Sequence, residues 1–251
     1  MNGCRKFQQE KNLNNFTVLI PVFKETEALK FSKDYFSELG ITPQYALDSK
    51  RKSRQAEVER CVGRAVPVFE NPENCIEANF RRFAALSPTD WILRIDCDEV
   101  PSLAALSFAN QFATNSNWKI AGFPRIECVP SGATLAADVT PGFQHFTKFP
   151  QYRLFNRKRV WFRSGIHTPG YYLPRIQKAE APPQACLYHL EYVFTSEQER
   201  DEKQKRYEAA GQSGSQNDDF RKWQTRSITS LTTEPVQDET LATAFKRFRR
   251  R

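Results

Sequence analysis

The stretch at residues 91–101 constrains this chain most, because it leads an apolar run directly into three carboxylates. Its sequence is Trp-Ile-Leu-Arg-Ile-Asp-Cys-Asp-Glu-Val-Pro. A short apolar run between prolines is typical of a strand buried on both faces. Asp96 and Asp98 alternate, so they lie on the same side of an extended backbone. Together they can face one cation or one nucleotide diphosphate, or they can form an ordinary solvated strand exit.

Apolar runs alternate with helical patterns over the first hundred residues. We predict strands at 16–23, 44–47 and 65–69 before the acidic strand, with Pro21 ending the first strand, and helices at 25–39, 53–62 and 74–86. This alternation predicts an α/β fold with a mostly parallel central sheet and helices on both faces. The carboxyl ends of the strands then share one edge, which brings together residues 23–25, 48–49 and 96–99. Each of these segments could also be a solvated loop.

The second half of the chain is less regular. We predict a helix at 102–114 capped by Ser102, a strand at 118–129, and a loop at 130–150 that is rich in Gly, Pro, Thr and Ser and covers the site. A hairpin joins 152–155 to 160–162 around a basic turn, a strand follows at 185–190, and a charged helix follows at 196–210.

Composition narrows the class of protein and of partner. The 251 residues include 20 Phe and 4 Trp, enough bulky apolar mass for one main core. A formal charge of +8 favours anionic partners such as nucleotide phosphates, lipid headgroups or nucleic acid, and charge alone does not choose among them. The 6 cysteines form no Cys-x-x-Cys pair, so neither a zinc knuckle nor a redox motif is indicated. Without an apolar signal or spanning segment, a cytoplasmic location is expected.

A series of short motifs then follows a recognisable order. Ile-Pro-Val-Phe-Lys-Glu at 20–25 precedes Asp48-Ser49, Ala78-Asn79-Phe80 and the Asp-x-Asp of the acidic strand, and Gln-Tyr-Arg-Leu-Phe-Asn-Arg, Gly-Ile-His and Leu-Tyr-His-Leu come later. Over residues 16–210 the chain thereby resembles family 2 glycosyltransferases with the Rossmann-like GT-A fold, in particular the branch that builds lipopolysaccharide core and capsule sugars. The resemblance implies a catalytic domain at 16–210. The polar residues 1–15 are expected to be a leader, and residues 211–251 are expected to form a linker with a basic helical extension.

The resemblance also implies roles for individual residues. The nucleotide-sugar donor, expected to be a UDP-sugar, would lie at the carboxyl edge of the sheet with a Mg²⁺ or Mn²⁺ ion, and the acceptor would be a glycan or a lipid-linked sugar. The implied donor-binding residues are Pro21, Phe23, Glu25, Asp48, Ser49, Asn79 and Asp96; the metal-binding residues are Asp96, Asp98 and His189; Arg153 is placed on the acceptor side.

One position departs from the family in a way that bears on catalysis. The branch commonly has His-Glu where this chain has His167-Thr168, so a carboxylate that could serve as the catalytic base is replaced. His167 can take that role, because the reference pKa of histidine is near neutrality, or it can be a packed turn residue. The candidate catalytic residues are therefore His167, as the possible base, and Asp98, as the metal-binding carboxylate.

The C-terminal segment 238–251 has an amphipathic helical pattern. Leu241, Ala244, Phe245 and Phe248 share one face, surrounded by basic residues. This helix could make a peripheral contact with the inner face of the membrane, or its phenylalanines could dock on the rest of the protein.

The sequence thus predicts a metal-dependent, inverting glycosyltransferase that transfers a hexose to a glycan or glycolipid hydroxyl. An alternative is a GT-A-fold protein of weakened catalysis that binds a glycan or nucleic acid, although nucleic acid is the less expected partner. A nucleotidyltransferase is a third class, but no Gly-rich phosphate loop follows the first strand.

Overall fold

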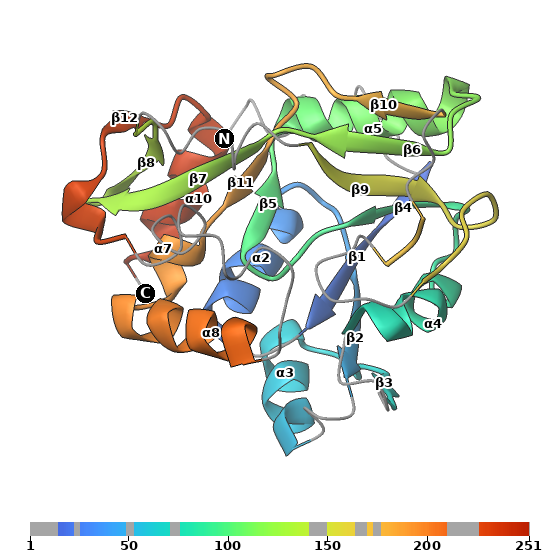
Figure 1. Ribbon diagram of the computed structural model, residues 1–251, viewed down its shortest axis with the longest axis horizontal. Helices are drawn as coiled ribbons and strands as arrows, with labels where there is room; N and C mark the ends of the chain where they lie inside the picture. The colour runs from blue at the N-terminus through green and yellow to red at the C-terminus, as the bar shows by residue number, and fades with distance from the viewer. Residues whose placement is uncertain are drawn as a thin grey trace. The chain divides into compact units, whose positions relative to one another are not determined.

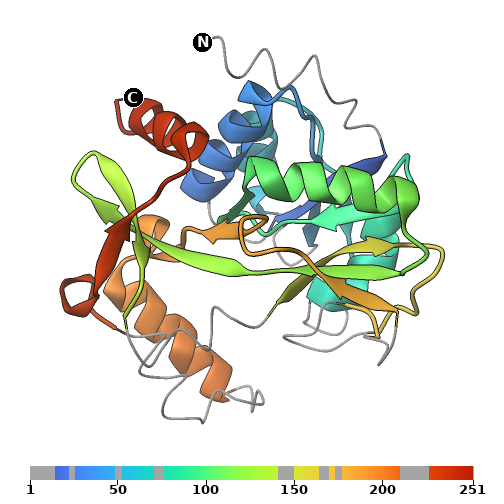
Figure 2. The same cartoon turned by 90° about the horizontal axis from the view of Figure 1, so that it is seen from above.

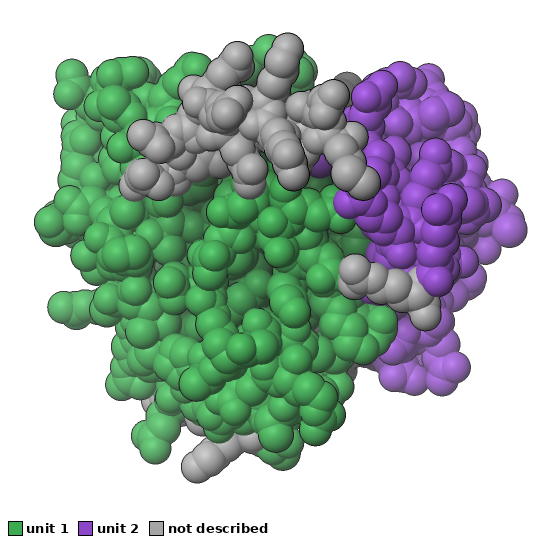
Figure 3. Space-filling model, turned by 180° about the vertical axis from the view of Figure 1, so that it is seen from behind, with its two compact units in different colours: residues 1–124, 150–187 green, residues 125–149, 188–251 purple. Residues whose placement is uncertain are grey.

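The computed structural model describes residues 15–22, 26–48, 53–70, 76–140, 150–163, 170–172, 177–209 and 226–250. The chain forms two compact units (Figure 3). Unit 1 contains residues 1–124 and 150–187, and unit 2 contains residues 125–149 and 188–251. The predicted leader lies almost wholly outside the described residues, as does the predicted boundary between 210 and 211.

Unit 1 is built on a seven-stranded sheet (Figure 1). Its order is β10 (Lys178–Glu180), β6 (Ile120–Phe123), β9 (Gln151–Asn156), β4 (Trp91–Arg94), β1 (Phe16–Val22), β2 (Gln44–Asp48) and β3 (Val68–Phe69). Strand β9 runs antiparallel to both of its neighbours, and the other strands share one direction. The predicted α/β class with a mostly parallel central sheet is confirmed.

Helices cover both faces of this sheet. Figure 2 shows α2 (Thr26–Glu38) and α5 (Leu103–Asn115) on one side and α4 (Phe80–Ala85) on the other. On the α4 side, Phe80 and Phe83 pack in one apolar cluster with Leu19 of β1 and Ile92 of β4. All seven residues of β1 are buried, as expected for a strand with helices on both faces.

Several predicted helices and their ends are confirmed. Helix α3 (Gln55–Val62) ends at Gly63, whose φ of 75° is left-handed and therefore suits glycine. The short 3₁₀ helix η2 (Ile76–Asn79) precedes α4, so the predicted helix at 74–86 is two consecutive pieces. Ser102 caps α5, since its Oγ accepts a hydrogen bond from the Ala105 amide at 3.1 Å. The short strand β5 (Glu99–Pro101) leads into that cap.

Unit 2 contains a smaller sheet beside short helices. Strand β8 (Thr134–Asp138) pairs antiparallel with β7 (Arg125–Ser131) and with β12 (Thr233–Pro235), and β11 (Leu187–His189) follows β7 in the sheet order. Val129, Ala136 and Tyr192 form its apolar cluster. The helical elements are α7 (Glu191–Phe194), α8 (Glu197–Ala209), η3 (Ile228–Ser230) and α10 (Glu239–Phe248). Helix α8 confirms the charged helix predicted at 196–210.

Four predictions were wrong in their details. Pro21 does not end β1, because it pairs with Ala46 inside the strand. The strand at 118–129 is two strands, β6 and β7, divided at Pro124, and the loop at 130–150 contains β8. Residues 152–155 form no hairpin with 160–162: β9 pairs with β4 and β6 instead, while Phe162 makes an isolated bridge to Tyr171.

The C-terminal helix takes the docking alternative. Leu241, Ala244 and Phe245 are buried, and the Phe248 ring meets the Phe194 ring edge-on at 5.8 Å between centroids. Lys246 and Arg247 of α10 are exposed, and so are Arg249 and Arg250, which follow the helix. The apolar face is therefore occupied by unit 2 itself. Among the described residues, no helix has the length and hydrophobicity needed to cross a membrane.

Candidate functional site

The strand ends that carry polar residues meet at one edge of the unit 1 sheet. Val22 pairs with Leu47, one residue before Asp48, and Leu19 pairs with Arg94, two residues before Asp96. The alignment continues past β4, because the Ile95 amide donates to the Leu19 carbonyl at 3.0 Å. Asp48 ends β2 and is buried. The register thus brings the ends of β1, β2 and β4 together, as the strand pattern predicts.

Asp96 lies between two arginines. Its Oδ1 accepts a hydrogen bond from Arg94 Nη2 at 3.0 Å, and its Oδ2 accepts one from Arg153 Nη2 at 2.5 Å. Arg153 Nη2 also donates to Glu99 Oε1 at 2.7 Å, and Glu99 Oε2 accepts from the Asp96 amide at 3.2 Å. Asp96, Glu99 and Arg153 are therefore one ion-pair network that joins β9 to the end of β4. Hydrogen bonds to charged partners are the stronger kind in proteins.

The network favours the charged forms of its members. Burial opposes the ionised form of Asp96, but the Arg153 and Arg94 guanidiniums outweigh it and hold the pKa of this carboxyl well below its usual range. Burial likewise opposes the cation at Arg153, yet Asp96 and Glu99 raise its pKa above the ordinary value. The side chain of Arg153 is 8% exposed. Arg153 thereby positions Asp96 and Glu99, and the acceptor-side role expected for it stays a prediction.

Below Arg94 lies an aromatic layer that anchors another part of the chain. The Arg94 guanidinium carbon lies 4.2 Å from the centroid of the Phe80 ring. Gly170 approaches the same ring from residues 170–172: its φ is 81°, and a Cβ there would lie 1.7 Å from Phe80 Cδ2. The Gly170 carbonyl accepts from the Arg163 amide at 3.0 Å. Only glycine fits this close approach of residue 170 to the Phe80 ring.

Asn79 is a buried polar residue at the start of α4. Its side-chain Nδ2 has no hydrogen-bond acceptor among the described residues, and the same holds for the Nε atoms of Arg94 and Arg153. A buried donor without an acceptor costs about 1–3 kcal/mol. An anionic or oxygen-rich ligand would relieve that cost if it reached these groups.

Asp98 is the carboxylate for which the sequence predicts direct binding of a divalent cation. It is half-buried and follows Cys97, whose Sγ lies 3.6 Å from the Pro21 carbonyl. Asp96 fits a direct metal contact poorly, because both of its oxygens accept from arginines. The described residues contain no group of three or more metal-binding side chains. Mg²⁺ nevertheless commonly binds one or two carboxylates together with substrate phosphates, and Asp98 suits that mode.

His189 belongs to a buried pair in unit 2. Its Nδ1 lies 2.5 Å from Glu127 Oε2, and Glu127 Oε1 lies 2.8 Å from Arg125 Nε. Glu127 is fully buried. In many metal-binding histidines, a carboxylate accepts a hydrogen bond from one ring nitrogen and thereby fixes the orientation of the ring and of its other nitrogen.

Some expected site residues lie outside the described parts of the chain. They are Phe23, Glu25, Ser49 and His167. Sequence reasoning in turn missed Arg94, Phe80, Gly170 and Glu127. The role of Arg94 could have been predicted from the sequence, because a charged residue inside an apolar run needs a buried partner.

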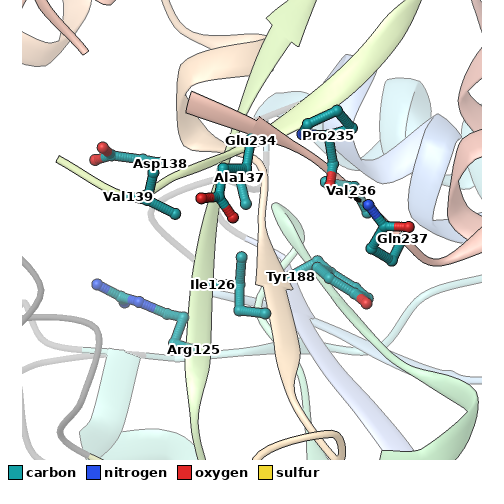
Figure 4. A pocket seen from close by; sticks show the side chains of 10 residues that line it. All are labelled: Arg125, Ile126, Ala137, Asp138, Val139, Tyr188, Glu234, Pro235, Val236 and Gln237. Carbon is teal, nitrogen blue, oxygen red and sulfur yellow. Dashed lines mark hydrogen bonds between the residues drawn. The ribbon is translucent and has the colours of Figure 1, made fainter. Parts of the chain in front are cut away.

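Unit 2 contains a separate pocket of about 400 Å³ (Figure 4). Figure 4 shows Arg125 and Ile126 along one strand, Ala137 and Asp138 on the next, and Glu234 beside Ala137, with which it pairs. The Asp138 carboxylate is paired with Arg226 at 2.5 Å. The remaining lining residues are Val139, Tyr188, Pro235, Val236 and Gln237.

Comparisons with known proteins give structural likeness only. No family model and no curated protein matches this sequence. Among solved structures, TarS 1-349 from S. aureus has a TM-score of 0.41 at 12% identity, over 75% of this chain and 63% of that one. TarS 1-349 in complex with UDP-GlcNAc has a TM-score of 0.39 at 13% identity, over 76% and 64%.

Two further matches come from other proteins. HddC from Yersinia pseudotuberculosis has a TM-score of 0.41 at 10% identity, over 69% of this chain and 92% of that one. A 4-diphosphocytidyl-2C-methyl-D-erythritol synthase has a TM-score of 0.37 at 17% identity, over 57% and 75%. At this level of similarity the matches carry no argument about activity, which has to be inferred from the residues of this chain.

Proposed function

We propose that this protein is a metal-dependent, inverting glycosyltransferase that transfers a hexose from a nucleoside-diphosphate sugar to a glycan or glycolipid hydroxyl. The observation that carries the proposal is the edge of the unit 1 sheet where Asp48, Asp96 and Asp98 follow parallel strands. Open α/β sheets bind nucleotides at this edge. The motif resemblance supplies the reaction class.

The residues at this edge of the sheet would bind different parts of the nucleotide-sugar donor. Asp48 would accept hydrogen bonds from the base, and Asp96 would approach the ribose with an orientation set by Arg94 and Arg153. Asn79 would donate to the donor's oxygens, which gives its buried amide a partner. Pro21, Phe23, Glu25 and Ser49 would border the nucleoside, with UDP as the proposed nucleotide.

Asp98 would hold Mg²⁺ or Mn²⁺ together with the diphosphate oxygens of the donor. The metal role of His189 rests on the motif resemblance alone. The bound ion would neutralise the negative charge that develops on the departing nucleoside diphosphate. His167 would remove the proton of the acceptor hydroxyl. The segment that contains it begins and ends at residues that pair with each other, Arg163 and Gly170, and Gly170 packs on Phe80 beneath Arg94.

A weakened, ligand-binding member of the same fold is the second candidate. Thr168 stands where the related branch commonly has Glu, and both Asp96 oxygens already have arginine partners. Such a protein would bind the nucleotide sugar, or a glycan, without turning it over.

The deciding experiment has two steps. A panel of UDP-, GDP- and dTDP-sugars is screened for an increase in Tm with and without Mn²⁺, because a ligand of the folded state raises stability. The donor found is then used to compare wild type with Asp98→Asn. This substitution removes the negative charge of the carboxylate that would bind the cation. It should lower turnover by about a hundredfold or more, while Tm without ligand changes little.

The matched control is Asp201→Asn, an exposed acid on α8 paired with Lys205 at 2.6 Å, and it should keep wild-type turnover. Full activity of Asp98→Asn, or of wild type in excess chelator, contradicts the metal role. Donor binding without transfer, restored by Thr168→Glu, supports the second candidate.

A further inference from the structure

Unit 1 exposes three large aromatic side chains in neighbouring segments. Trp161 is 80% exposed, Tyr172 is 55% exposed and Trp118 is 46% exposed, and these are the exposed large hydrophobic residues found in the described part of the chain. Water contact with so much apolar surface is unfavourable, and clustered rather than scattered exposure marks an interaction site.

Hydrogen bonds bring together the segments that carry the three residues. The Tyr172 amide donates to the Trp161 carbonyl at 2.9 Å, so these two residues lie opposite each other beside the Phe162–Tyr171 bridge. Arg159 links this segment to the third aromatic residue, because its guanidinium donates to the carbonyls of Asn117 and Trp118. Figures 1 and 2 agree that the turn after β9 and the connection from α5 to β6 lie at the same end of the sheet. We call this surface the aromatic edge.

The aromatic edge is strongly basic. Its described segments, 117–119, 157–163 and 170–172, contain no acidic residue, and their basic residues are Lys119, Arg157, Lys158, Arg159 and Arg163. The neighbouring acid Asp90 contacts Lys158 at 2.9 Å and offsets one of these charges. Arg163 lies 5.0 Å from the centroid of the Tyr172 ring, which places a cation directly beside one of the exposed aromatic residues.

From this charge and exposure we infer that the aromatic edge docks on an anionic lipid surface. Trp and Tyr prefer the boundary between headgroups and acyl chains, and Lys and Arg beside them are attracted to anionic headgroups. The alternative membrane contact, the apolar face of α10, is buried. This inference is independent of the proposed transferase activity.

Cosedimentation with vesicles tests it. The full-length protein is mixed with vesicles of one part phosphatidylglycerol to two parts phosphatidylcholine, or of phosphatidylcholine alone, at low and high salt. Wild type should bind the anionic vesicles, and salt should weaken the binding. Trp161→Ala with Tyr172→Ser should weaken it by about tenfold or more. Lys158→Gln with Arg163→Gln should weaken it by about fivefold for each residue replaced.

Arg249→Gln with Arg250→Gln, which removes the same charge from the exposed side of α10, is the matched control and should change binding by less than about twofold. Loss of binding in this control, equal binding by the Trp161/Tyr172 variant, or no vesicle binding by wild type would overturn the inference. So would tighter binding of a short single-stranded oligonucleotide that competes with the vesicles.

Discussion

Asp96 shows how a single residue can be both part of a site and part of its scaffold. A third of its side-chain surface is exposed, while both carboxylate oxygens accept from arginines. Arg153 also donates to Glu99, and Glu99 accepts from the Asp96 amide. These two hydrogen bonds orient the backbone just before Asp98. The carboxylate is thus held in place before any ligand binds, which lowers the cost of ordering the site.

Asp96→Asn should lower the free energy of unfolding by about 1–3 kcal/mol at pH 7, because two arginines lose their anionic partner. The pKa of Asp96 is depressed in the folded state, so its stabilising contribution is complete above the unfolded pKa of about 3.9 and is lost as pH falls below that range. Urea unfolding of both proteins between pH 8 and pH 3 should show a constant difference that shrinks only at the acid end.

Asp201→Asn serves as the comparison here too, since its exposed ion pair should leave the free energy of unfolding within about 0.5 kcal/mol of wild type. A difference between Asp96→Asn and wild type that grew as pH fell would contradict the assigned ion pairs.

At the scale of elements, the start of α5 has an unusual concentration of hydrogen bonds. Ser102 Oγ accepts from the Ala105 amide at 3.1 Å and from the Cys186 amide at 3.2 Å, and it donates to the Gln184 carbonyl at 3.0 Å. The Ser102 amide also donates to the Cys186 carbonyl at 2.9 Å. One hydroxyl therefore caps a helix and ties it to a segment more than eighty residues away.

Ser102→Ala should destabilise the protein by about 2 kcal/mol, more than an ordinary cap, because it also removes the partner of the buried Cys186 amide and of the Gln184 carbonyl. Thermal unfolding measures the effect. Ser107→Ala, within α5, is the control and should cost little, since alanine is the better helix former. Equal changes in Tm for the two variants would show that the cap adds nothing.

The sequence predicted the elements whose signals are local. The helix at Ser102, the end of α3 at Gly63, and the run of parallel strands all follow from caps, glycines and apolar periodicity. It did not predict where β9 would pair, because the partners of Gln151–Asn156 are Trp91–Leu93 and Ile120–Phe123, far away in the chain. It also placed Asp96 correctly at a strand end but missed its arginine partners, since ion pairs between distant segments leave no local pattern.

At the scale of the molecule, the C-terminal helix is part of the core of unit 2. Helix α10 begins at the cap Asp238, whose Oδ1 accepts from the Leu241 amide at 3.0 Å, and it buries Leu241 and Phe245 completely. Its position near β8 makes it a structural element rather than an appendage.

Phe245→Ala should therefore lower the free energy of unfolding by about 3–5 kcal/mol, whereas Arg250→Gln should change it by less than about 0.5 kcal/mol. Urea denaturation distinguishes the two. The vesicle binding of Arg250→Gln should equal that of wild type. Wild-type stability in Phe245→Ala would mean that α10 is only loosely attached.

The antiparallel strand β9 has a consequence for how the protein is made. Residues 151–156 fill the gap between β4 and β6, so the first 124 residues alone leave one edge of β4 without a partner. As the chain emerges from the ribosome, residues 125–149, which belong to unit 2, must be synthesised before that gap closes. During this interval a hydrophobic strand edge is open to other nascent chains. Pauses in translation between residues 124 and 156 would lengthen that exposure, and chaperone binding would be most useful there.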